Sequence, residues 1–199
     1  MSGPARSAVI FFCDTWAPRG RLPFHFTMQA HRIQMSEPEK KTNPRKKKFI
    51  VRNSRIHGRG VYAARKIREG ERIIEYRGER ISWKEADRRP PSDPEDPHHT
   101  FFFSLDDGKH VIDANVGGNA ARWVNHSCAP NCETEETDDG RVYIDAIRDI
   151  RRGEELLYDY SLIIDERLTK TLKRQYRCRC GSDECRGTML AIKQRKAKS

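Results

Sequence analysis

The sequence predicts a mainly β fold with few short helices, and three observations support this. From about residue 49 the chain consists of short β-branched and aromatic runs separated by glycine and charged residues. Asp106-Asp107-Gly108 and Asp139-Gly140 are typical hairpin turns. Strands do not alternate with long helices, and Gly58-Arg-Gly60 is only a lone GxG, so a doubly wound nucleotide-binding fold is not predicted.

The predicted strands follow one another through this β-rich part of the chain. They are Phe49–Arg52, Gly60–Ala63, Arg72–Tyr76, Phe101–Leu105, His110–Asp113, Arg141–Ile147 and Glu155–Tyr158. One segment occurs twice, because Ile67-Arg-Glu-Gly-Glu-Arg-Ile-Ile resembles Ile150-Arg-Arg-Gly-Glu-Glu-Leu-Leu. We interpret both copies as a glycine turn that leads into a buried strand.

Three short helices are predicted from capping residues and apolar spacing. Ser82-Trp-Lys-Glu is a capping box whose helix ends at Pro90-Pro91. Residues 118–124 form a short helix that leads into the next segment. Asp165 caps a stretch with Leu168, Leu172 and Tyr176 at i, i+4, i+8 spacing.

Charge is concentrated at the two ends of the 199-residue chain, which is long enough for one domain with a core. Residues 1–48 contain ten Lys/Arg and three Asp/Glu, and residues 186–199 contain five Lys/Arg and no acid. The total is +10, so residues 49–185 carry −2. A dedicated nucleic-acid-binding domain is therefore not predicted, and the solvated basic tails would contact polyanions only weakly.

The chain divides into four predicted segments. Residues 1–48 are a basic, disordered extension, 49–164 the β-rich domain, 165–190 a C-terminal helix with a cysteine segment, and 191–199 a basic tail. No run approaches a signal sequence or a membrane span, so we expect an intracellular protein without a membrane partner. Six cysteines in such a chain indicate metal or thiol chemistry rather than disulfides.

Residues 122–132, Arg-Trp-Val-Asn-His-Ser-Cys-Ala-Pro-Asn-Cys, combine a polar turn with two cysteines. Alone they are typical of an ordinary loop, although such residues can supply both hydrogen bonds and a thiolate. A second group, Cys178-x-Cys180-x4-Cys185, has arginine neighbours that favour thiolates. Because a structural Zn²⁺ site takes four ligands, the fourth is expected to be Cys128 or Cys132.

Tyr158-Asp-Tyr160 closes a predicted strand and allows two interpretations. Such tyrosines are often core residues with a hydroxyl at the rim. Alternatively, a phenol lies in an apolar channel and points at a reacting nitrogen.

Four motifs together resemble the SET-domain protein lysine methyltransferases, in the order found in that family. They are His57-Gly-Arg-Gly-Val-Tyr-Ala, Glu75-Tyr-Arg-Gly-Glu, Gly118-Asn-Ala-Ala-Arg-Trp-Val-Asn-His-Ser-Cys-Ala-Pro-Asn-Cys and Arg152-Gly-Glu-Glu-Leu-Leu-Tyr-Asp-Tyr. The terminal cysteine group resembles the family's post-SET zinc segment. The resemblance covers about residues 49–190, is nearest to the trithorax branch, and includes no cysteine-rich pre-SET block.

The resemblance implies a SET-type β-rich fold in which residues 125–128 thread a loop as a pseudoknot. It also implies a pocket for S-adenosylmethionine that is covered by the segment after Cys178. The residues implied to bind the cofactor are His57, Gly58, Arg59, Asn125, His126 and Arg179.

The resemblance also assigns a role to individual residues at the reaction centre. Tyr160 matches the catalytic tyrosine, and Tyr158 matches the position associated with the number of methyl groups added. Phe101 stands where many active members have a tyrosine that helps to hold the lysine amine. The implied ligands of a structural zinc are Cys128, Cys178, Cys180 and Cys185.

The implied reaction is methyl transfer to a lysine side chain. Deprotonating a lysine with a pKa of about 10.4 at neutral pH costs about 4 kcal/mol. A narrow apolar channel and the cofactor's sulfonium both disfavour the ammonium form. In-line attack then requires mainly positioning, with Tyr160 orienting the amine.

We therefore predict a lysine N-methyltransferase that acts on a basic protein such as a histone or histone-like protein. An acidic hairpin is expected to attract that substrate, or else to be a solvated turn: Glu133, Glu135, Glu136, Asp138 and Asp139. Location would be chromatin in a eukaryote or cytoplasm in a bacterium. The alternatives are a silent SET module that binds a basic peptide, supported by Phe101, and a zinc-bearing nucleic-acid binder that uses the basic tails.

Overall fold

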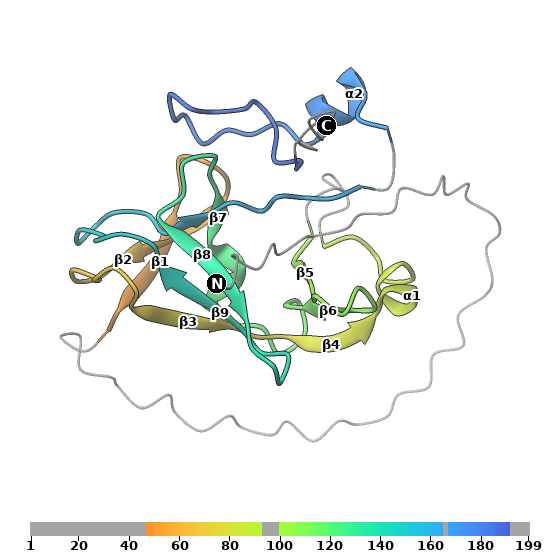
Figure 1. Cartoon of the computed structure of the whole chain (residues 1–199), viewed down its shortest axis with the longest axis horizontal. Helices are drawn as coiled ribbons and strands as arrows, with labels where there is room; N and C mark the ends of the chain where they lie inside the picture. The colour runs from red at the N-terminus through yellow and green to blue at the C-terminus, as the bar shows by residue number, and fades with distance from the viewer. Residues whose placement is uncertain (1–46, 93–99, 165–166, 192–199) are drawn as a thin grey trace, which may run out of the picture.

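A computed structural model describes residues 47–92, 100–164 and 167–191 of the chain (Figure 1). Strands predominate in these ranges and the helices are short, as the sequence predicts. The predictions for residues 1–46, for most of the acidic loop after Pro91, for Asp165 as a helix cap and for the tail from residue 192 lie outside the described residues.

The strands of the described residues form four small sheets. β1 (Phe49–Asn53) pairs antiparallel with β2 (Arg59–Ala63). β9 (Val142–Ala146) lies between β3 (Arg72–Tyr76) and β8 (Cys132–Glu136). β6 (His110–Asp113) lies between β4 (Glu79–Ser82) and β5 (Phe102–Ser104). β7 (Asn125–His126) pairs in parallel with β10 (Leu157–Tyr158).

Three of these strands, β4, β7 and β8, were not among those predicted. β8 reads Cys-Glu-Thr-Glu-Glu and lies at the edge of its sheet, where charged side chains are tolerated because one side faces solvent. β7 is two residues long and exists only through its pairing with β10. Neither has a local apolar pattern that reveals a strand.

The two copies of the repeated segment pair with each other. Ile67 and Ile150 form an antiparallel bridge, in which each backbone N–H donates to the other's carbonyl at 3.0 and 2.9 Å. Both side chains are fully buried in the main core. Gly70 and Gly153 have φ values of +73° and +85°, so each copy turns through a conformation that favours glycine. The repeat is therefore a structural device, as interpreted from the sequence.

The helices begin at capping side chains. Ser82 accepts a hydrogen bond from Glu85 N and caps α1 (Trp83–Ala86), and Asn119 caps the 3-10 helix η1 (Ala120–Trp123). α2 (Lys170–Gln175) is capped by Thr169, so the described helix begins later than the Asp165 cap predicts. None of these helices has the length and apolar character that crossing a membrane requires.

Two apolar clusters position the functional site. The main core lies among the sheets and includes Val61, Phe103, Ile144 and Leu156. A smaller cluster joins the segment after Tyr160 to α2 and the end of the described chain: Leu162, Ile164, Leu172, Tyr176 and Leu190. Tyr160 packs against both clusters. The C-terminal segment thereby lies beside the sheets as a separate layer (Figure 1).

Candidate active site

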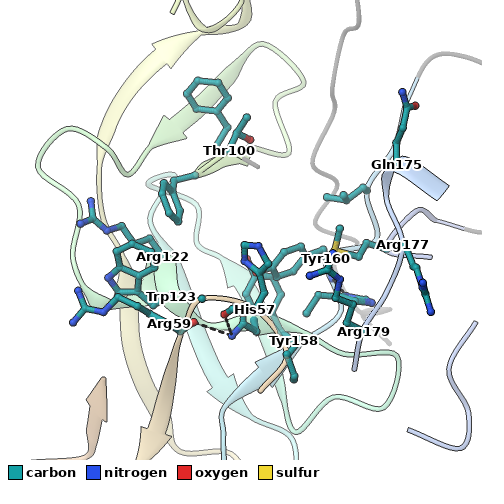
Figure 2. Close-up of a pocket in the computed structure, with 18 of the residues that line it drawn as sticks. His57, Arg59, Thr100, Arg122, Trp123, Tyr158, Tyr160, Gln175, Arg177 and Arg179 are labelled. Atoms are coloured by element: carbon teal, nitrogen blue, oxygen red, sulfur yellow. Dashed lines mark hydrogen bonds between the residues drawn. The ribbon is translucent and has the colours of Figure 1, made fainter. Parts of the chain in front are cut away.

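A cavity of about 410 Å³ lies between the sheets and the C-terminal segment. In Figure 2, Arg59, Arg122 and Trp123 lie on one side, and Arg177 and Arg179 lie on the other. The cavity brings together most of the sequence-predicted site residues. Those among its lining residues are His57, Gly58, Arg59, Phe101, Asn125, His126, Tyr158, Tyr160 and Arg179.

The Asn125 side chain fixes the turn that forms one wall of the cavity. Its Nδ2 donates to the carbonyl of Arg59 at 2.9 Å and is 3.3 Å from the carbonyl of His57. It also donates to Glu155 Oε1 at 3.0 Å. Gly58 has a φ of +43°, which an L side chain rarely adopts, so the turn depends on glycine. The turn therefore presents its backbone to the cavity in a fixed conformation.

His126 is buried and connects the central stretch to the end of β10. Its Nδ1 accepts a hydrogen bond from the backbone N–H of Tyr160 at 3.1 Å. The pKa of His126 is lowered to about 4, chiefly by burial, with Asp159 acting against this shift and Arg186 adding to it. The imidazole is therefore neutral near pH 7 and is able to act as this acceptor.

The Tyr160 hydroxyl donates to the backbone carbonyl of Val124 at 2.8 Å. The ring of Tyr160 lies 5.3 Å from that of His126 and 4.8 Å from that of Tyr158, between centroids. Ser161, the next residue, has a φ of +44°, and its N–H donates to Asp159 Oδ1. The chain thus turns sharply directly after Tyr160, in a conformation that costs a non-glycine residue about 1–3 kcal/mol.

Three tyrosines of the cavity remain protonated at neutral pH. Burial raises the pKa of Tyr76, of Tyr158 and of Tyr160 above the usual value of a phenol. None of them is therefore able to act as a general base near pH 7, and each is able to donate or orient a hydrogen bond.

Tyr76 was assigned no role from the sequence, although it stands in the Glu75-Tyr-Arg-Gly-Glu motif. Its hydroxyl donates to the carbonyl of Phe101 at 3.0 Å. The Phe101 ring packs edge-on against Trp123, with 4.9 Å between the ring centroids. This wall is consequently aromatic, and the ring at position 101 has no hydroxyl.

The sequence analysis identified only some of the arginines that line the cavity. It named Arg59 and Arg179, but Arg122, Arg174 and Arg177 also line the cavity, and among residues 47–92, 100–164 and 167–191 no Asp or Glu does. The sequence feature that could have indicated Arg177 was its position directly before Cys178.

Four cysteines converge beside the cavity. The sulfur atoms of Cys128, Cys178, Cys180 and Cys185 all lie within 4.8 Å of one another. The Cys128 and Cys178 sulfurs are 3.7 Å apart, close to the ~3.8 Å that tetrahedral zinc with ~2.3 Å bonds requires. Cys132 instead lies in the core, where burial raises the pKa of its thiol to about 12.

The thiols of this cluster differ in their protonation. Burial raises the pKa of Cys128, and it raises that of Cys178 together with hydrogen bonds to the neighbouring thiols. Burial also acts against ionisation of Cys180, but hydrogen bonds from Ser182 and the backbone lower its pKa to about 5. Four thiolates at this spacing would repel one another unless a cation were bound, so the donor set fits a divalent metal.

An ion pair joins the cysteine segment to the end of β10. Both terminal nitrogens of Arg186 donate to the Asp159 carboxylate, at 2.7 and 2.5 Å. Arg186 follows Cys185, and Asp159 stands between Tyr158 and Tyr160. This pair, less than a third exposed on each side, was not predicted from the sequence.

Comparison with known proteins agrees with the motifs. Residues 58–161 match the SET domain family. The histone-lysine N-methyltransferase trithorax of Drosophila virilis is 40% identical over 139 residues, which are 68% of this chain and 3% of that protein. The histone-lysine N-methyltransferase, H3 lysine-4 specific, of Candida albicans is 40% identical over 147 residues, 72% of this chain and 14% of that protein. The chain thus spans a small part of these relatives.

Solved structures give the same result. One is described as ctPRC2 in an autoinhibited conformation bound to S-adenosylmethionine, with a TM-score of 0.51 and 34% identity. The aligned region covers 57% of this chain and 15% of that one. Chaetomium thermophilum Polycomb Repressive Complex 2 bound to GSK126 gives a TM-score of 0.52 at 34% identity, over 57% of this chain and 16% of that one. The matched region spans the cavity's central residues, and the relatives confirm the trithorax-like branch. The chain belongs to the SET domain family.

Proposed function

We propose that the protein transfers a methyl group from S-adenosylmethionine to the side-chain amine of a lysine in another protein. The observation that carries this proposal is the position of the Tyr160 hydroxyl. It lies in the same cavity as the turn that Asn125 fixes, beside the neutral ring of His126. The names of the relatives support lysine as the acceptor.

The cofactor would be held by the residues around the Gly58 turn together with the C-terminal segment. The proposed binding residues are His57, Gly58, Arg59, Asn125, His126 and Arg179, which all line the cavity. When bound, S-adenosylmethionine supplies an electrophilic methyl group attached to a sulfonium. The backbone carbonyls near Gly58 and the buried side chains provide the fixed polar contacts that such a ligand requires.

The residues of the chain act on the amine rather than on the methyl group. Tyr158, Phe101 and Trp123 are aromatic residues of the cavity lining, and they would exclude water and disfavour an ammonium ion. Because the pKa of Tyr160 is raised by burial, its phenol stays neutral and orients the amine lone pair without removing the proton. The proton leaves to solvent before attack, and no side chain needs to accept it.

Zinc in this proposal is structural and takes no part in methyl transfer. Cys128 belongs to the central stretch, and the three other cysteines belong to the C-terminal segment. A metal held by all four would fasten that segment beside the cavity, as in a post-SET module. Position and donor type both suit this role.

The substrate is proposed to be a histone or a histone-like protein, and chromatin the location in a eukaryotic cell. The printed names of the trithorax-type relatives support this choice. Recognition of the acceptor depends on the residues at the mouth of the cavity.

Transfer of a labelled methyl group from S-adenosylmethionine to histones and to lysine peptides tests the proposed function. Tyr160→Phe is expected to lose most transfer, by about 10²-fold or more, because the hydroxyl that orients the amine is absent. The affinity for cofactor, measured by calorimetry, should change little. Tyr143→Phe is the matched control, because Tyr143 lies in β9 and does not line the cavity. Full transfer by Tyr160→Phe would contradict the assignment.

A silent binding module is the second candidate, and the ring of Phe101 without a hydroxyl favours it. Cofactor binding with no transfer to any protein or peptide would support that candidate. Retention of a lysine peptide under those conditions would identify the cavity as a binding site alone.

A further inference from the structure

Glu155 stands in the last of the four sequence motifs, but no function was assigned to it from the sequence. It lies opposite Tyr62 of β2, with which it forms an antiparallel bridge. The residue before Glu155 and the residue after it are both hydrogen-bonded to β2 through their backbones, at 2.9 and 2.8 Å. The buried side chain of Asn131 also donates to the Glu155 carbonyl, at 2.7 Å. The Glu155 side chain therefore extends from a backbone that is held on both sides.

The carboxylate of Glu155 accepts hydrogen bonds from two neutral side chains. The Tyr62 hydroxyl donates to Oε2 at 2.8 Å, and Asn125 Nδ2 donates to Oε1 at 3.0 Å. Asn125 lines the cavity, whereas Glu155 and Tyr62 do not. Glu155 is therefore able to influence a bound ligand through Asn125.

Three acceptors determine which end of the Asn125 amide faces them. Glu155 Oε1, the carbonyl of Arg59 and the carbonyl of His57 all lie within 3.3 Å of Nδ2. The bonds to the two carbonyls are the dashed lines in Figure 2. Carbonyl and ionised carboxylate oxygens accept hydrogen bonds and cannot donate them, so a flipped amide would place its oxygen against three acceptors. The amide oxygen therefore points away from Glu155 and is the group that Asn125 offers to the cavity.

Glu155 is the charged acceptor among the three. A hydrogen bond to an ionised group is about twice as strong as one between neutral groups. Without Glu155, the second N–H of Asn125 has the carbonyl of His57 as its acceptor, at 3.3 Å, which is longer than an ordinary N–H···O bond. Removal of the carboxylate should therefore leave the amide free to rotate.

Gly60 provides the space that the carboxylate occupies. A Cβ atom at Gly60 would lie 2.2 Å from Glu155 Oε1 and 3.0 Å from its Cδ, closer than real Cβ atoms approach a neighbour. An alanine at this position would consequently push the carboxylate away from Asn125. Gly60 itself does not line the cavity. This packing offers a second way to disturb the same hydrogen bond.

We propose, on the basis of the proposed function, that Glu155 is a positioning residue for the cofactor. Its carboxylate holds the Asn125 amide in one orientation, so that the amide oxygen accepts a hydrogen bond from a donor group of S-adenosylmethionine. The acceptor geometry of Glu155, rather than its charge, carries this role.

A direct effect of the charge on the reaction centre is the competing explanation. Burial raises the pKa of Tyr160, and the charge of Glu155 raises it further. Removing that charge would move the pKa of Tyr160 back towards the ordinary phenol value of about 10, at which the hydroxyl is still protonated near pH 7. Tyr160 therefore keeps its proton without the charge of Glu155, and a variant that retains the acceptor but not the charge separates the two explanations.

Calorimetry with S-adenosylmethionine and the full chain tests the proposal. Glu155→Ala should weaken cofactor binding about tenfold, because one N–H of Asn125 loses its acceptor and the amide loses its fixed orientation. Glu155→Gln should bind within about threefold of the original protein, since its amide oxygen accepts from Asn125 and its nitrogen donates to the Tyr62 oxygen. If Glu155→Gln binds as weakly as Glu155→Ala, the charge is the cause and the proposal is overturned.

Tyr62→Phe is the matched control, because it removes the other hydrogen bond of the same carboxylate and leaves the bond to Asn125 in place. This variant should lose some thermal stability, measured as Tm, and keep the cofactor affinity of the original protein. An equal loss of affinity in Tyr62→Phe and Glu155→Ala would reduce Glu155 to a structural role and contradict the proposal.

A double-mutant cycle separates positioning from a general loss of stability. In an Asn125→Ala background there is no amide to orient, so Glu155→Ala should weaken cofactor binding no further. Additive losses would mean that Glu155 acts independently of Asn125, and would overturn the proposal. Gly60→Ala keeps the carboxylate but displaces it, and it should also weaken binding. If Glu155→Ala does not fold, Gly60→Ala decides the question, and an unchanged affinity in that variant counts against the proposal.

The proposed function is tested separately in the same variants. Transfer of a labelled methyl group is measured at saturating cofactor, where kcat should decrease less than the affinity does. If the original protein binds S-adenosylmethionine but methylates no histone or lysine peptide, the proposed function fails, and the affinities still decide the role of Glu155. If it binds no S-adenosylmethionine, the cofactor site and the role of Glu155 are both refuted.

Discussion

The ring at position 101 in the aromatic wall of the cavity is a phenylalanine and has no hydroxyl. The Phe101 ring packs on Trp123, and the backbone carbonyl of Phe101 accepts a hydrogen bond from the Tyr76 hydroxyl. Tyr158 brings a hydroxyl to the same cavity, and it is 6% exposed. The cavity in which the proposed acceptor nitrogen would lie is therefore lined by one ring with a hydroxyl and one without.

Phe101→Tyr is expected to shift the product towards fewer methyl groups. The added hydroxyl fills space beside the acceptor nitrogen and offers it another hydrogen bond, so a nitrogen that already carries a methyl group fits less well. Mass spectrometry of a peptide after long incubation gives the distribution of products. Phe102→Tyr, at the adjacent first residue of β5, makes the same chemical change at another ring that lines the cavity. An unchanged distribution in Phe101→Tyr would show that this ring does not limit the number of methyl groups.

At the residue scale, the sequence indicated individual side chains that line the cavity better than it indicated which residues they would contact. Asn125, His126 and Tyr160 were identifiable because they stand in long motifs, and the cysteine spacing indicated a metal site. Cys128 and Cys132 were equivalent on spacing alone, and only the fold separates them, because it brings the Cys128 sulfur to the other three and places Cys132 in the core. Arg174 and Arg177 were missed because their side chains meet the cavity only after the chain folds back, which no local pattern reveals.

The C-terminal segment is an element whose attachment depends on few contacts. A small apolar cluster, the cysteine group and the pair between Arg186 and Asp159 hold it beside the sheets. Charged hydrogen bonds of this type contribute about 1.5–3 kcal/mol when they are shielded from water. The ion pair therefore contributes to the docking of the segment as well as to the position of the Tyr158–Tyr160 turn.

Arg186→Met is expected to loosen this segment and to weaken cofactor binding by about tenfold, because it removes both hydrogen bonds to Asp159. Amide hydrogen exchange should rise across residues 177–191, and calorimetry measures the affinity for S-adenosylmethionine. Arg65→Met provides the control, since it removes a two-bond pair with Glu71 that does not line the cavity. Exchange that stays slow in Arg186→Met would mean that the ion pair does not hold the segment.

Elements with a regular local pattern were predictable, and those that depend on partners were not. β3 and β6 have the bounds that their apolar runs predict, and Ser82 caps α1 as its capping box predicts. β7 and β8 were missed, because a two-residue parallel strand and a charged edge strand form only through their neighbours. Helix α2 begins where Thr169 caps it, which competing polar residues nearby obscured.

For the molecule as a whole, the proposed zinc should stabilise the C-terminal segment, and the stability of the sheets should depend little on it. Chelation or Cys180→Ser is expected to expose amides in residues 167–191 and to weaken cofactor binding, because the ligands no longer hold the segment. The sheet of β3, β9 and β8 should stay protected, since its core contains none of the four cysteines. Hydrogen exchange together with metal analysis measures both effects.

Cys132→Ala is the control for chelation, because it removes a buried thiol outside the cysteine cluster. This variant should retain its metal while losing some stability of unfolding. A metal-free preparation with full activity and a protected C-terminal segment would contradict the zinc site.

The strand order has a consequence for how the protein is made. β9 lies between β3 and β8, although it is synthesised after both of them. In the same way, Ile67 forms its bridge only after Ile150 has been synthesised. A nascent chain halted ahead of residue 142 therefore holds two strands that lack the neighbour meant to join them. Pairings so distant along the chain form slowly, and unpaired edges promote aggregation. Folding of this domain is consequently delayed until β9 has been synthesised, and translation products that end before β9 are expected to be insoluble.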